Sequence, residues 1–488
     1  MKTFHSLLSF LLIALLIISA FVLSAGAEGC FSIVVGKDAS ADGFVIMAHN
    51  EDDGPPQVVN HYKIPRMRYP SGKKVKLING GELEQIEETW AYLWSEMPGM
   101  IFSDSYVNEW GVCIASDNCP SREDQAEITD GGISYMLRKL VAQRAQTARE
   151  GVLIAGNLIE RFGYTAPGRT YIICDPNEGW FFCAVQGKHW LAARVPDDQV
   201  AMIANTYAVH QVDLTDSNRV LACGDIVDYA VSRGWYDPDK DGSFDFAAAY
   251  ANPAIASDSN NVCRQWSGLR RVASHPIPLS PHLPFSVTPA KKLGVADVFE
   301  ILRDHYEGTE FYQTSPEKGN PHENDLATIC NRTTQTSFVV QLRADRPLDV
   351  GIVYWVSLSP PCTSVFLPYH FGIEDFPVGY SGSPEQPSNE LYQKKVTAPF
   401  TANPAEAFWT FSNSYHKING NYADMVIPIK KKIGEIENRA LSTQKTVEET
   451  ALQLYSTDHA AALNTLFNYS NELYISALEA MDKVLSGK

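Results

Sequence analysis

The sequence has no extended basic run, and its acidic residues are in excess. Its 488 residues include 40 Lys and Arg against 57 Asp and Glu, which gives a formal net charge of −17. Proteins that bind nucleic acid neutralise phosphates with clustered basic side chains, so we expect no nucleic-acid partner. An excess of negative charge of this size is explained by solubility alone.

Several common catalytic signatures are also missing. The chain contains no phosphate-binding loop, no nucleophile-elbow serine motif and no His-Glu-x-x-His. No pair of closely spaced Cys or His residues is followed by a second such pair, which is the spacing typical of zinc sites. The sequence therefore predicts neither a metal nor an organic cofactor.

One loop is similar to a calcium site but lacks a ligand. Residues 237–245 place Asp at positions 1, 3 and 5 and Gly at position 6 of a calcium loop. Position 12 is Ala248, so the bidentate glutamate is missing. We interpret this segment as an Asp-rich turn, and calcium binding is left open.

The first 29 residues have the features of a secretory signal. Lys2 gives a positive start, residues 7–23 are mostly apolar, and small residues before Cys30 offer cleavage sites. We expect removal at Gly29 and an exported protein without stable membrane insertion. Two alternatives are an uncleaved membrane anchor and a lipoprotein in which Cys30 carries the lipid.

The chain has nine cysteines, an odd number that leaves at least one thiol unpaired. In an exported protein the other eight are able to form bridges, and the local candidates are Cys113 with Cys119 and Cys174 with Cys183. The equally good alternative is that most of them are buried thiols.

Cleavage at Gly29 would make Cys30 the first residue of the mature chain. Its α-amine (pKa near ~8) and its thiol (pKa near ~8.5) would then sit on one residue, so Cys30 would supply both nucleophile and base. Residues 31–35 and 44–48 predict two strands joined at an Asp42-Gly43 turn. This hairpin would return the polar residues at its end to Cys30.

The same segment resembles the opening of the secernin-related dipeptidases, cysteine peptidases of the N-terminal-nucleophile (Ntn) hydrolase superfamily. The shared motifs are Cys30 with its apolar strand, Gly-Lys at 36–37, Ala-Ser-Ala-Asp-Gly at 39–43 and Ala-His-Asn-Glu-Asp at 48–52. The departure is His49, where Arg is commoner in that family. The resemblance extends through residues 361–369.

The resemblance implies roles for residues near the hairpin end and beyond it. Asp52 would fix the α-ammonium of Cys30 or the substrate amine by a charge-assisted hydrogen bond, and His49 would face the substrate. Asn205, at a strand end, would donate to the oxyanion. Asn108 and Arg271 would bind substrate. The simpler interpretations are turn chemistry for the amides and an exposed helical arginine.

The element pattern predicts an α+β fold rather than βαβ alternation. Strands are predicted at 89–94, 107–115, 170–174, 180–185, 190–195, 200–204, 336–342 and 350–358, and helices at 131–163, 244–251, 295–306 and 442–485. We expect residues 190–195 and 200–204 to continue one sheet. The resemblance implies the four-layer αββα sandwich of Ntn hydrolases with a helical C-terminal tail.

We therefore expect a signal peptide at residues 1–29, a catalytic domain at 30–435 and a C-terminal helical segment at 436–488. The predicted function is an exported cysteine dipeptidase with small peptides as substrates. The alternatives are an Ntn amidase or acylase acting on N-acyl compounds, and a lipid-anchored surface protein without enzymatic activity. The sequence leaves open whether the chain forms a homo-oligomer.

Overall fold

The computed structural model describes residues 29–53, 58–97, 104–381, 403 and 405–487. The predicted secretory signal lies outside the described residues except for Gly29. Within the described part of the chain, no helix combines the length and the apolar character that a membrane crossing requires.

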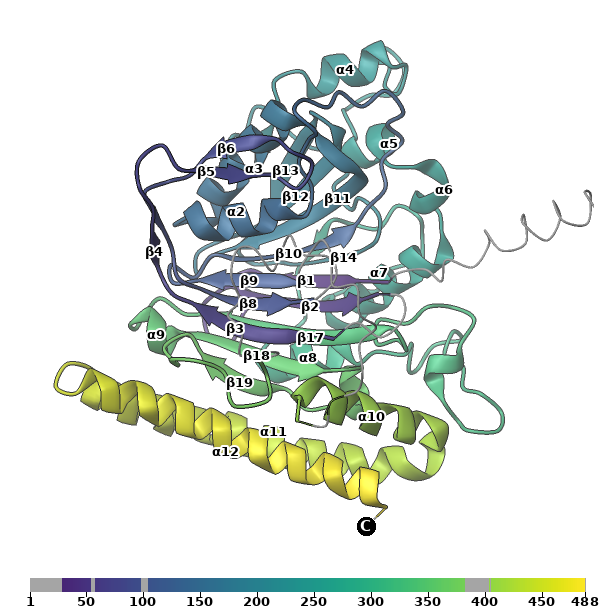
Figure 1. Cartoon of the computed structure of the whole chain (residues 1–488). Helices are drawn as coiled ribbons and strands as arrows, with labels where there is room; N and C mark the ends of the chain where they lie inside the picture. Colours follow the sequence, from purple (N-terminus) through teal and green to yellow (C-terminus); the bar gives the residue numbers. More distant parts are fainter. Residues whose placement is uncertain (1–28, 54–57, 98–103, 382–402, 404, 488) are drawn as a thin grey trace, which may run out of the picture.

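Two antiparallel sheets form the centre of the molecule (Figure 1). The seven-stranded sheet has the order β16 (Ser286–Val287), β14 (Val200–Ala204), β1 (Phe31–Val35), β2 (Ile46–Asp52), β17 (Thr334–Leu342), β18 (Ile352–Leu358) and β19 (Leu367–His370). The eight-stranded sheet has the order β15 (Val220–Ala222), β13 (Trp190–Arg194), β12 (Gly179–Gly187), β11 (Tyr164–Cys174), β10 (Cys113–Asn118), β9 (Ser105–Asn108), β8 (Tyr92–Glu96) and β3 (Asn60–Ile64).

The two sheets pack face to face, with β1 against β10 and β11. Helices cover both outer faces (Figure 1). On the eight-stranded sheet lie α2 (Met136–Arg144) and α3 (Ala148–Phe162). On the seven-stranded sheet lie α7 (Ser259–Val272), α8 (Val295–Leu302), α10 (Ala407–Gly420), α11 (Tyr422–Tyr455) and α12 (His459–Ser486). The predicted four-layer αββα sandwich is confirmed.

The remaining described elements are short. They are β4 (Met67–Arg68), β5 (Lys74–Lys76), β6 (Glu82–Glu84), β7 (Glu88–Thr89), α4 (Ile226–Ser232), α5 (Phe246–Tyr250), α6 (Pro253–Ala256), α9 (Leu348–Gly351) and the 3₁₀ turns η1 (Pro321–Glu323) and η2 (Pro361–Thr363). None of them belongs to the two large sheets.

The N-terminal hairpin forms as predicted, with one shift. β1 has the predicted bounds, whereas β2 runs from Ile46 to Asp52 rather than over residues 44–48. The extension has a cause in the sheet, because β17 pairs with the far side of β2 as far as Asp52. Every residue of β2 is buried, since helices cover one face of its sheet and the other sheet covers the second.

The prediction that residues 190–204 continue one sheet is wrong. β13 ends in the eight-stranded sheet, and β14 pairs with β1 in the other sheet. The segment that connects β13 to β14 packs against the backbone of Gly36, where an added Cβ would lie 2.4 Å from the Asp197 carbonyl oxygen. Glycine is required there because the two chain segments touch.

The C-terminal helices begin earlier than predicted. α10 starts at Ala407, and the predicted domain boundary between residues 435 and 436 falls inside α11. α11 and α12 pack against each other, and α12 also packs on β19. Glu448 of α11 fixes this layer, since its carboxylate pairs with Arg343 at 2.6 Å and Arg346 at 2.8 Å.

Candidate active site

Cys30 directly precedes β1, at the open end of the hairpin where β2 ends. The antiparallel register pairs Phe31 with Asn50, so Cys30 faces the last residues of β2. The thiol is buried, with its Sγ 3.6 Å from Glu51 Oε1 and 3.5 Å from the Asp52 carbonyl oxygen. The predicted approach of the hairpin end to Cys30 is confirmed.

Arg264, on α7, binds the backbone of both Gly29 and Cys30. Its guanidinium donates to the carbonyl oxygen of Gly29 and, at 3.0 Å, to that of Cys30. It also donates at 2.9 Å to Asn205 Oδ1. Arg264 is fully buried. A rigid guanidinium is suited to this task because it places several donors in one plane.

Asp52 and Asn331 complete an enclosure around Gly29. Asn331 Nδ2 donates to Asp52 Oδ2 at 2.7 Å. A Cβ added to Gly29 would lie 3.0 Å from Asn331 Nδ2, 3.1 Å from an Arg264 nitrogen and 3.3 Å from Asp52 Oδ2. The residue before Cys30 is thus surrounded by polar side chains, and burial raises the pKa of Asp52 to about 8.

His49 and Glu51 lie on the other face of β2, toward the eight-stranded sheet. His49 Nε2 lies 3.1 Å from Glu51 Oε2, and its Nδ1 lies 2.8 Å from Ser32 Oγ. Burial lowers the pKa of His49, but the Glu51 hydrogen bond and the charges of Asp117 and Asp104 raise it overall to about 9. His49 is therefore a protonated, fully buried partner of Glu51.

Two more carboxylates lie between the sheets. Ser32 Oγ donates to Asp117 Oδ2 at 2.5 Å. Burial raises the pKa of Asp117 to about 6 and that of Asp104 to about 7.

The thiol of Cys30 itself is buried among these acids. Burial, followed by the charges of Glu51, Asp117 and Asp52, raises the pKa of the Cys30 thiol. The thiol therefore stays protonated at neutral pH, so its activation requires a base.

The structure brings together the three residues predicted as catalytic. Cys30, Asp52 and Asn205 are connected through Arg264 and the Gly29–Cys30 backbone. Asn205 donates one amide hydrogen to the Asn118 carbonyl oxygen at 3.1 Å. One amide hydrogen of Asn205 remains for a further acceptor.

The substrate-binding role predicted for Asn108 conflicts with its contacts. Its Nδ2 donates to the carbonyl oxygens of Ala142 and Ala145, and its Oδ1 accepts from the backbone of Trp110 and Val112. All four hydrogen-bonding positions of the amide are therefore occupied within its own loop and the end of α2. Asn108 stabilises this turn instead.

Arg271 also takes a structural position. Its guanidinium donates to the buried Asp304 Oδ2 at 2.7 Å. Arg264 lies two helical turns earlier and is the arginine that reaches Cys30. The predicted substrate-side histidine, His49, is enclosed between the sheets and 0% exposed.

Sequence reasoning missed Glu51, Arg264 and Asn331. Glu51 lies inside the motif singled out at residues 48–52, and Asn331 lies just ahead of the strand predicted at 336–342. Arg264 shares α7 with Arg270 and Arg271, and nothing in the local pattern distinguishes it from them. Its burial depends on packing of α7 against β14.

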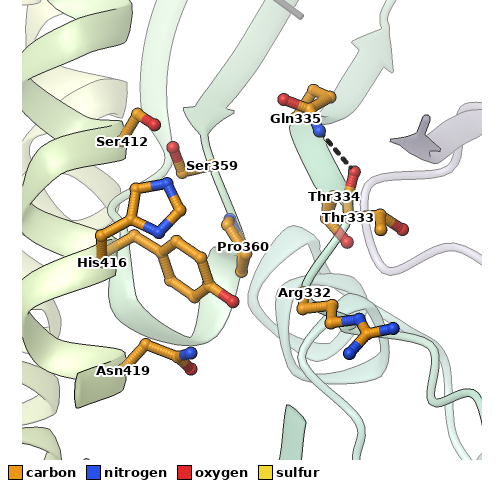
Figure 2. Close-up of a pocket in the computed structure, with 10 residues that line it drawn as sticks. Arg332, Thr333, Thr334, Gln335, Ser359, Pro360, Ser412, His416 and Asn419 are labelled. Carbon is orange, nitrogen blue, oxygen red and sulfur yellow. Dashed lines mark hydrogen bonds between the residues drawn. The ribbon is translucent and has the colours of Figure 1, made fainter. Parts of the chain in front are cut away.

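A cavity of about 350 Å³ opens beside this region, between residues 332–335 and α10 (Figure 2). Thr334 lines it and also pairs with Asp52 in the sheet. Cys30 is not among its lining residues. The cavity therefore adjoins the Asp52 side of the site.

The structure also describes the cysteines and the Asp-rich loop that the sequence left open. All nine cysteines are free thiols and all are buried. In the residue 237–245 loop, Asp237 pairs with Lys240 and Asp245 caps α5 by accepting from the Ala248 amide at 2.8 Å. These contacts are those of an Asp-rich turn.

Comparison with known proteins gives a family match. The model of "Peptidase family C69" matches residues 117–419. A "Probable dipeptidase" of Salmonella dublin is 28% identical over 73% of this chain and 84% of the relative. A "Probable dipeptidase" of Latilactobacillus sakei is 27% identical over 85% and 89%. A "Probable dipeptidase B" of Streptococcus pyogenes serotype M1 is 25% identical over 81% and 80%.

Among solved structures, penicillin V acylase from Agrobacterium tumefaciens is similar over 72% of this chain and 88% of its own. Its sequence identity is 12% and the TM-score is 0.34. Conjugated bile acid hydrolase from Clostridium perfringens gives 13% identity and the same TM-score. These values are too low to say anything of this chain's chemistry.

Proposed function

This chain belongs to peptidase family C69, a family of cysteine peptidases, and we propose that it is an exported dipeptidase whose nucleophile is the thiol of Cys30. Its similarity to named dipeptidases supports dipeptides as the substrate class. The family match begins at residue 117, so the role of Cys30 rests on the structure of its surroundings.

The observation that carries the proposal is the setting of the Gly29–Cys30 peptide bond. Arg264 donates to the carbonyl oxygen of this bond and to that of the next, on Cys30, and Asp52 and Asn331 lie against Gly29. Removal of Gly29 would leave the α-amine of Cys30 beside Asp52, and the positive charge of its ammonium form would favour ionisation of this carboxyl group. A carboxylate there would orient the amine by a charge-assisted hydrogen bond.

The free amine would supply the base that the thiol requires. Because burial, followed by the charges of Glu51, Asp117 and Asp52, raises the thiol pKa, the sulfur needs a neighbouring group to take its proton. The α-amine of Cys30 accepts this proton, directly or through one water, while Sγ attacks the scissile carbonyl carbon. No step of this sequence uses a metal or organic cofactor.

The later steps stabilise the oxyanion, return the proton to the leaving amino acid and hydrolyse the acyl-enzyme. The carbonyl oxygen becomes an oxyanion, for which Asn205 Nδ2 and the Arg264 guanidinium are the nearby donors. The protonated amine then returns its proton to the leaving amino acid, and a thioester joins Cys30 to the first residue. Water attacks this thioester and regenerates the thiol.

Export is the second part of the proposal. The apolar residues 7–23 and the small residues before Cys30 support removal of a leader at Gly29. Two routes lead to the same free Cys30. Either a signal peptidase cuts at Gly29, or it cuts at Ala27 and the chain then removes Glu28 and Gly29 itself. We propose that the mature enzyme is secreted, periplasmic or on the cell surface.

The test compares dipeptides with N-acyl amino acids as substrates of the purified protein. We expect turnover of dipeptides, no turnover for Cys30→Ala, and little for Cys30→Ser because a hydroxyl is the weaker nucleophile. Cys223→Ala, another buried thiol, is the matched control and should retain turnover.

Two results would overturn the proposal. Dipeptide hydrolysis by Cys30→Ala at the wild-type rate would exclude the nucleophile. Turnover of N-acyl amino acids alone would assign the chain to the amidase class instead.

A further inference from the structure

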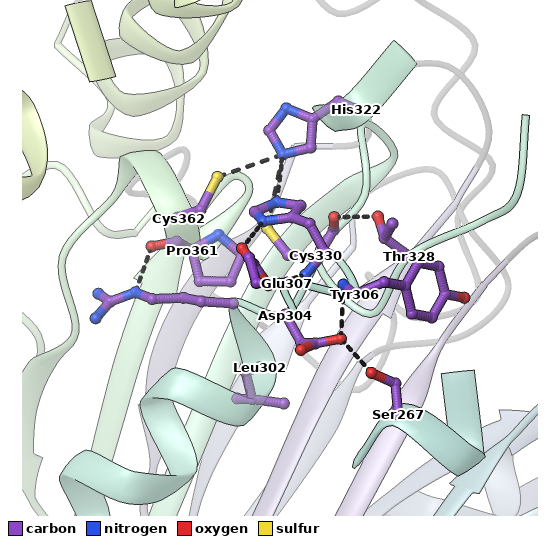
Figure 3. A network of polar contacts seen from close by, with 12 residues as sticks. Ser267, Leu302, Asp304, Tyr306, Glu307, His322, Thr328, Cys330, Pro361 and Cys362 are labelled. Carbon is purple, nitrogen blue, oxygen red and sulfur yellow. Dashed lines mark hydrogen bonds and ion pairs between the residues drawn. The ribbon is translucent and has the colours of Figure 1, made fainter. Parts of the chain in front are cut away.

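A second group of reactive side chains is buried away from Cys30. His305, after α8, His322 in η1, Cys330 before β17 and Cys362 in η2 bring one ligand atom each to within 4.8 Å of one another. None of the four residues is more than 5% exposed. Figure 3 shows His322, Cys330 and Cys362 meeting at this point.

We propose that these four side chains hold a structural zinc ion. The distances fit: His322 Nε2 lies 3.2 Å from His305 Nε2, 3.3 Å from Cys362 Sγ and 3.7 Å from Cys330 Sγ. Zinc bonds of about 2.0–2.1 Å to nitrogen and about 2.3 Å to sulfur place tetrahedral ligands roughly 3.3–3.8 Å apart.

The outer nitrogens of both rings are already bound. His305 Nδ1 lies 3.0 Å from Glu307 Oε1, and His322 Nδ1 lies 3.0 Å from Asn419 Oδ1. Asn419 Oδ1 also accepts from Asn320 Nδ2 at 2.7 Å, which identifies it as the amide oxygen. Hydrogen bonds of this kind orient zinc-binding imidazoles and fix their tautomer.

These outer bonds leave a problem that a cation solves. With a proton on each Nδ1, both Nε2 atoms carry lone pairs, and they face each other at 3.2 Å. Two buried lone pairs at this distance repel unless a shared proton or a metal ion lies between them, and the two neighbouring sulfur atoms favour the metal ion. Zinc would bind both, and the two sulfur atoms complete its shell.

The ligand set favours zinc over other common ions. Two thiolates and two imidazoles in a tetrahedral arrangement suit zinc, whereas magnesium and calcium prefer oxygen ligands. All four positions would be filled by protein, so the ion would stabilise the fold rather than take part in hydrolysis. It would join the four segments that carry its ligands.

The sequence did not reveal this site because its ligands are scattered. The search for closely spaced pairs failed, since the four residues are 17, 8 and 32 positions apart in order. Only the folding of the loops around β17 brings them together.

The test measures zinc in the untagged full-length protein after purification without chelator. We expect about one zinc per chain, and a Co²⁺-exchanged sample with the absorption of tetrahedral cobalt bound by thiolate. The Cys30→Ala variant should keep the ion, which separates this group from the second group of possible ligands, Cys30, His49 and Glu51. Cys223→Ser is the matched control and should also keep it.

Cys362→Ser and His322→Gln should bind at least 10-fold less zinc and melt at a lower temperature. If they fail to fold, the wild-type stoichiometry and cobalt spectrum still decide. A wild-type protein that holds no zinc after dialysis against it, or a Cys330–Cys362 disulfide found by peptide mass spectrometry, would overturn the proposal. Equal zinc in Cys362→Ser would overturn the placement.

Discussion

Asn331 Nδ2 donates a 2.7 Å hydrogen bond to Asp52 Oδ2. Asn331 directly follows Cys330 in the chain. This bond joins the loop of the proposed zinc site to the end of the strand beside Cys30. The position of Asp52 therefore depends on a segment nearly 280 residues later in the chain. This hydrogen bond is a contact through which the proposed ion would influence the position of Asp52.

Arg264 and Arg271 provide a matched pair on one helix. We expect Arg264→Lys to lower kcat on dipeptides roughly 10²-fold, because one ammonium cannot replace a guanidinium that, after Gly29 is removed, still holds the Cys30 carbonyl oxygen, Asn205 Oδ1 and Asn261 Oδ1. Arg271→Lys, which keeps its charge beside Asp304, should stay near wild type. Steady-state kinetics of both variants check this. Equal losses in the two variants would contradict the assignment.

Asp52 predicts the pH dependence of the unprocessed chain. Burial raises its pKa from the usual 3.8 to about 8, so the folded state binds a proton that the unfolded state releases between these values. Its contribution to stability is present below pH 4 and is lost as the pH rises toward 8.

Denaturant unfolding at pH 5 and pH 8.5 measures this loss in the Cys30→Ala protein, purified with Gly29 still attached. The double variant Cys30→Ala/Asp52→Asn should lose less stability over the same range, and Cys30→Ala/Glu84→Gln, altered at an exposed carboxylate, should match Cys30→Ala. Identical slopes with and without Asp52 would contradict the prediction.

Asn108 and Asn205 should separate stability from catalysis. Asn108→Ala removes four hydrogen bonds to backbone groups and should cost about 2–4 kcal/mol of unfolding free energy. Its kcat/KM, measured well below the melting temperature, should be unchanged. Asn205→Ala should lower kcat instead. A rise in KM for Asn108→Ala without loss of stability would restore the substrate-binding role.

Glu448 predicts a loss of stability in acid. Burial alone would raise its pKa, but hydrogen bonds from His370 and Arg343 lower it to about 2. The folded state then binds fewer protons than the unfolded state between pH 4.5 and 2. This contributes about 3 kcal/mol above pH 4.5, which is lost as the pH falls through that range.

Glu448→Gln should lower stability at pH 7 and flatten its decline between pH 5 and 3. The exposed Glu84→Gln should leave both unchanged. Urea unfolding at each pH checks the comparison, and a parallel decline in Glu448→Gln and the wild type would refute the role of this carboxylate.

The sequence predicted the parts of the fold that depend on neighbouring residues. β1 has its predicted bounds, and the 170–185 hairpin forms as β11 and β12, because apolar strands and turn residues are visible locally. The sheet to which β14 belongs could not be predicted, since it depends on pairing with β1 some 170 residues earlier.

The residues of the candidate site also fall into those that local sequence predicts and those that depend on contacts distant in the chain. Cys30 and Asp52 were found because one hairpin brings them together. Arg264 and Asn331 reach them from α7 and from the start of β17, through contacts that no local pattern encodes. For Asn108 the sequence could not distinguish an Asx turn from a substrate-binding amide, because the two have the same sequence signature.

The N-terminal residue of the active enzyme tests the central claim most directly. Protein that hydrolyses dipeptides should be isolated from its own host, and its N-terminus read by peptide mass spectrometry. We expect Cys30 as the first residue, with an unmodified amine and thiol. Active protein that retains residues ahead of Cys30, or that carries lipid on its sulfur, would contradict the account.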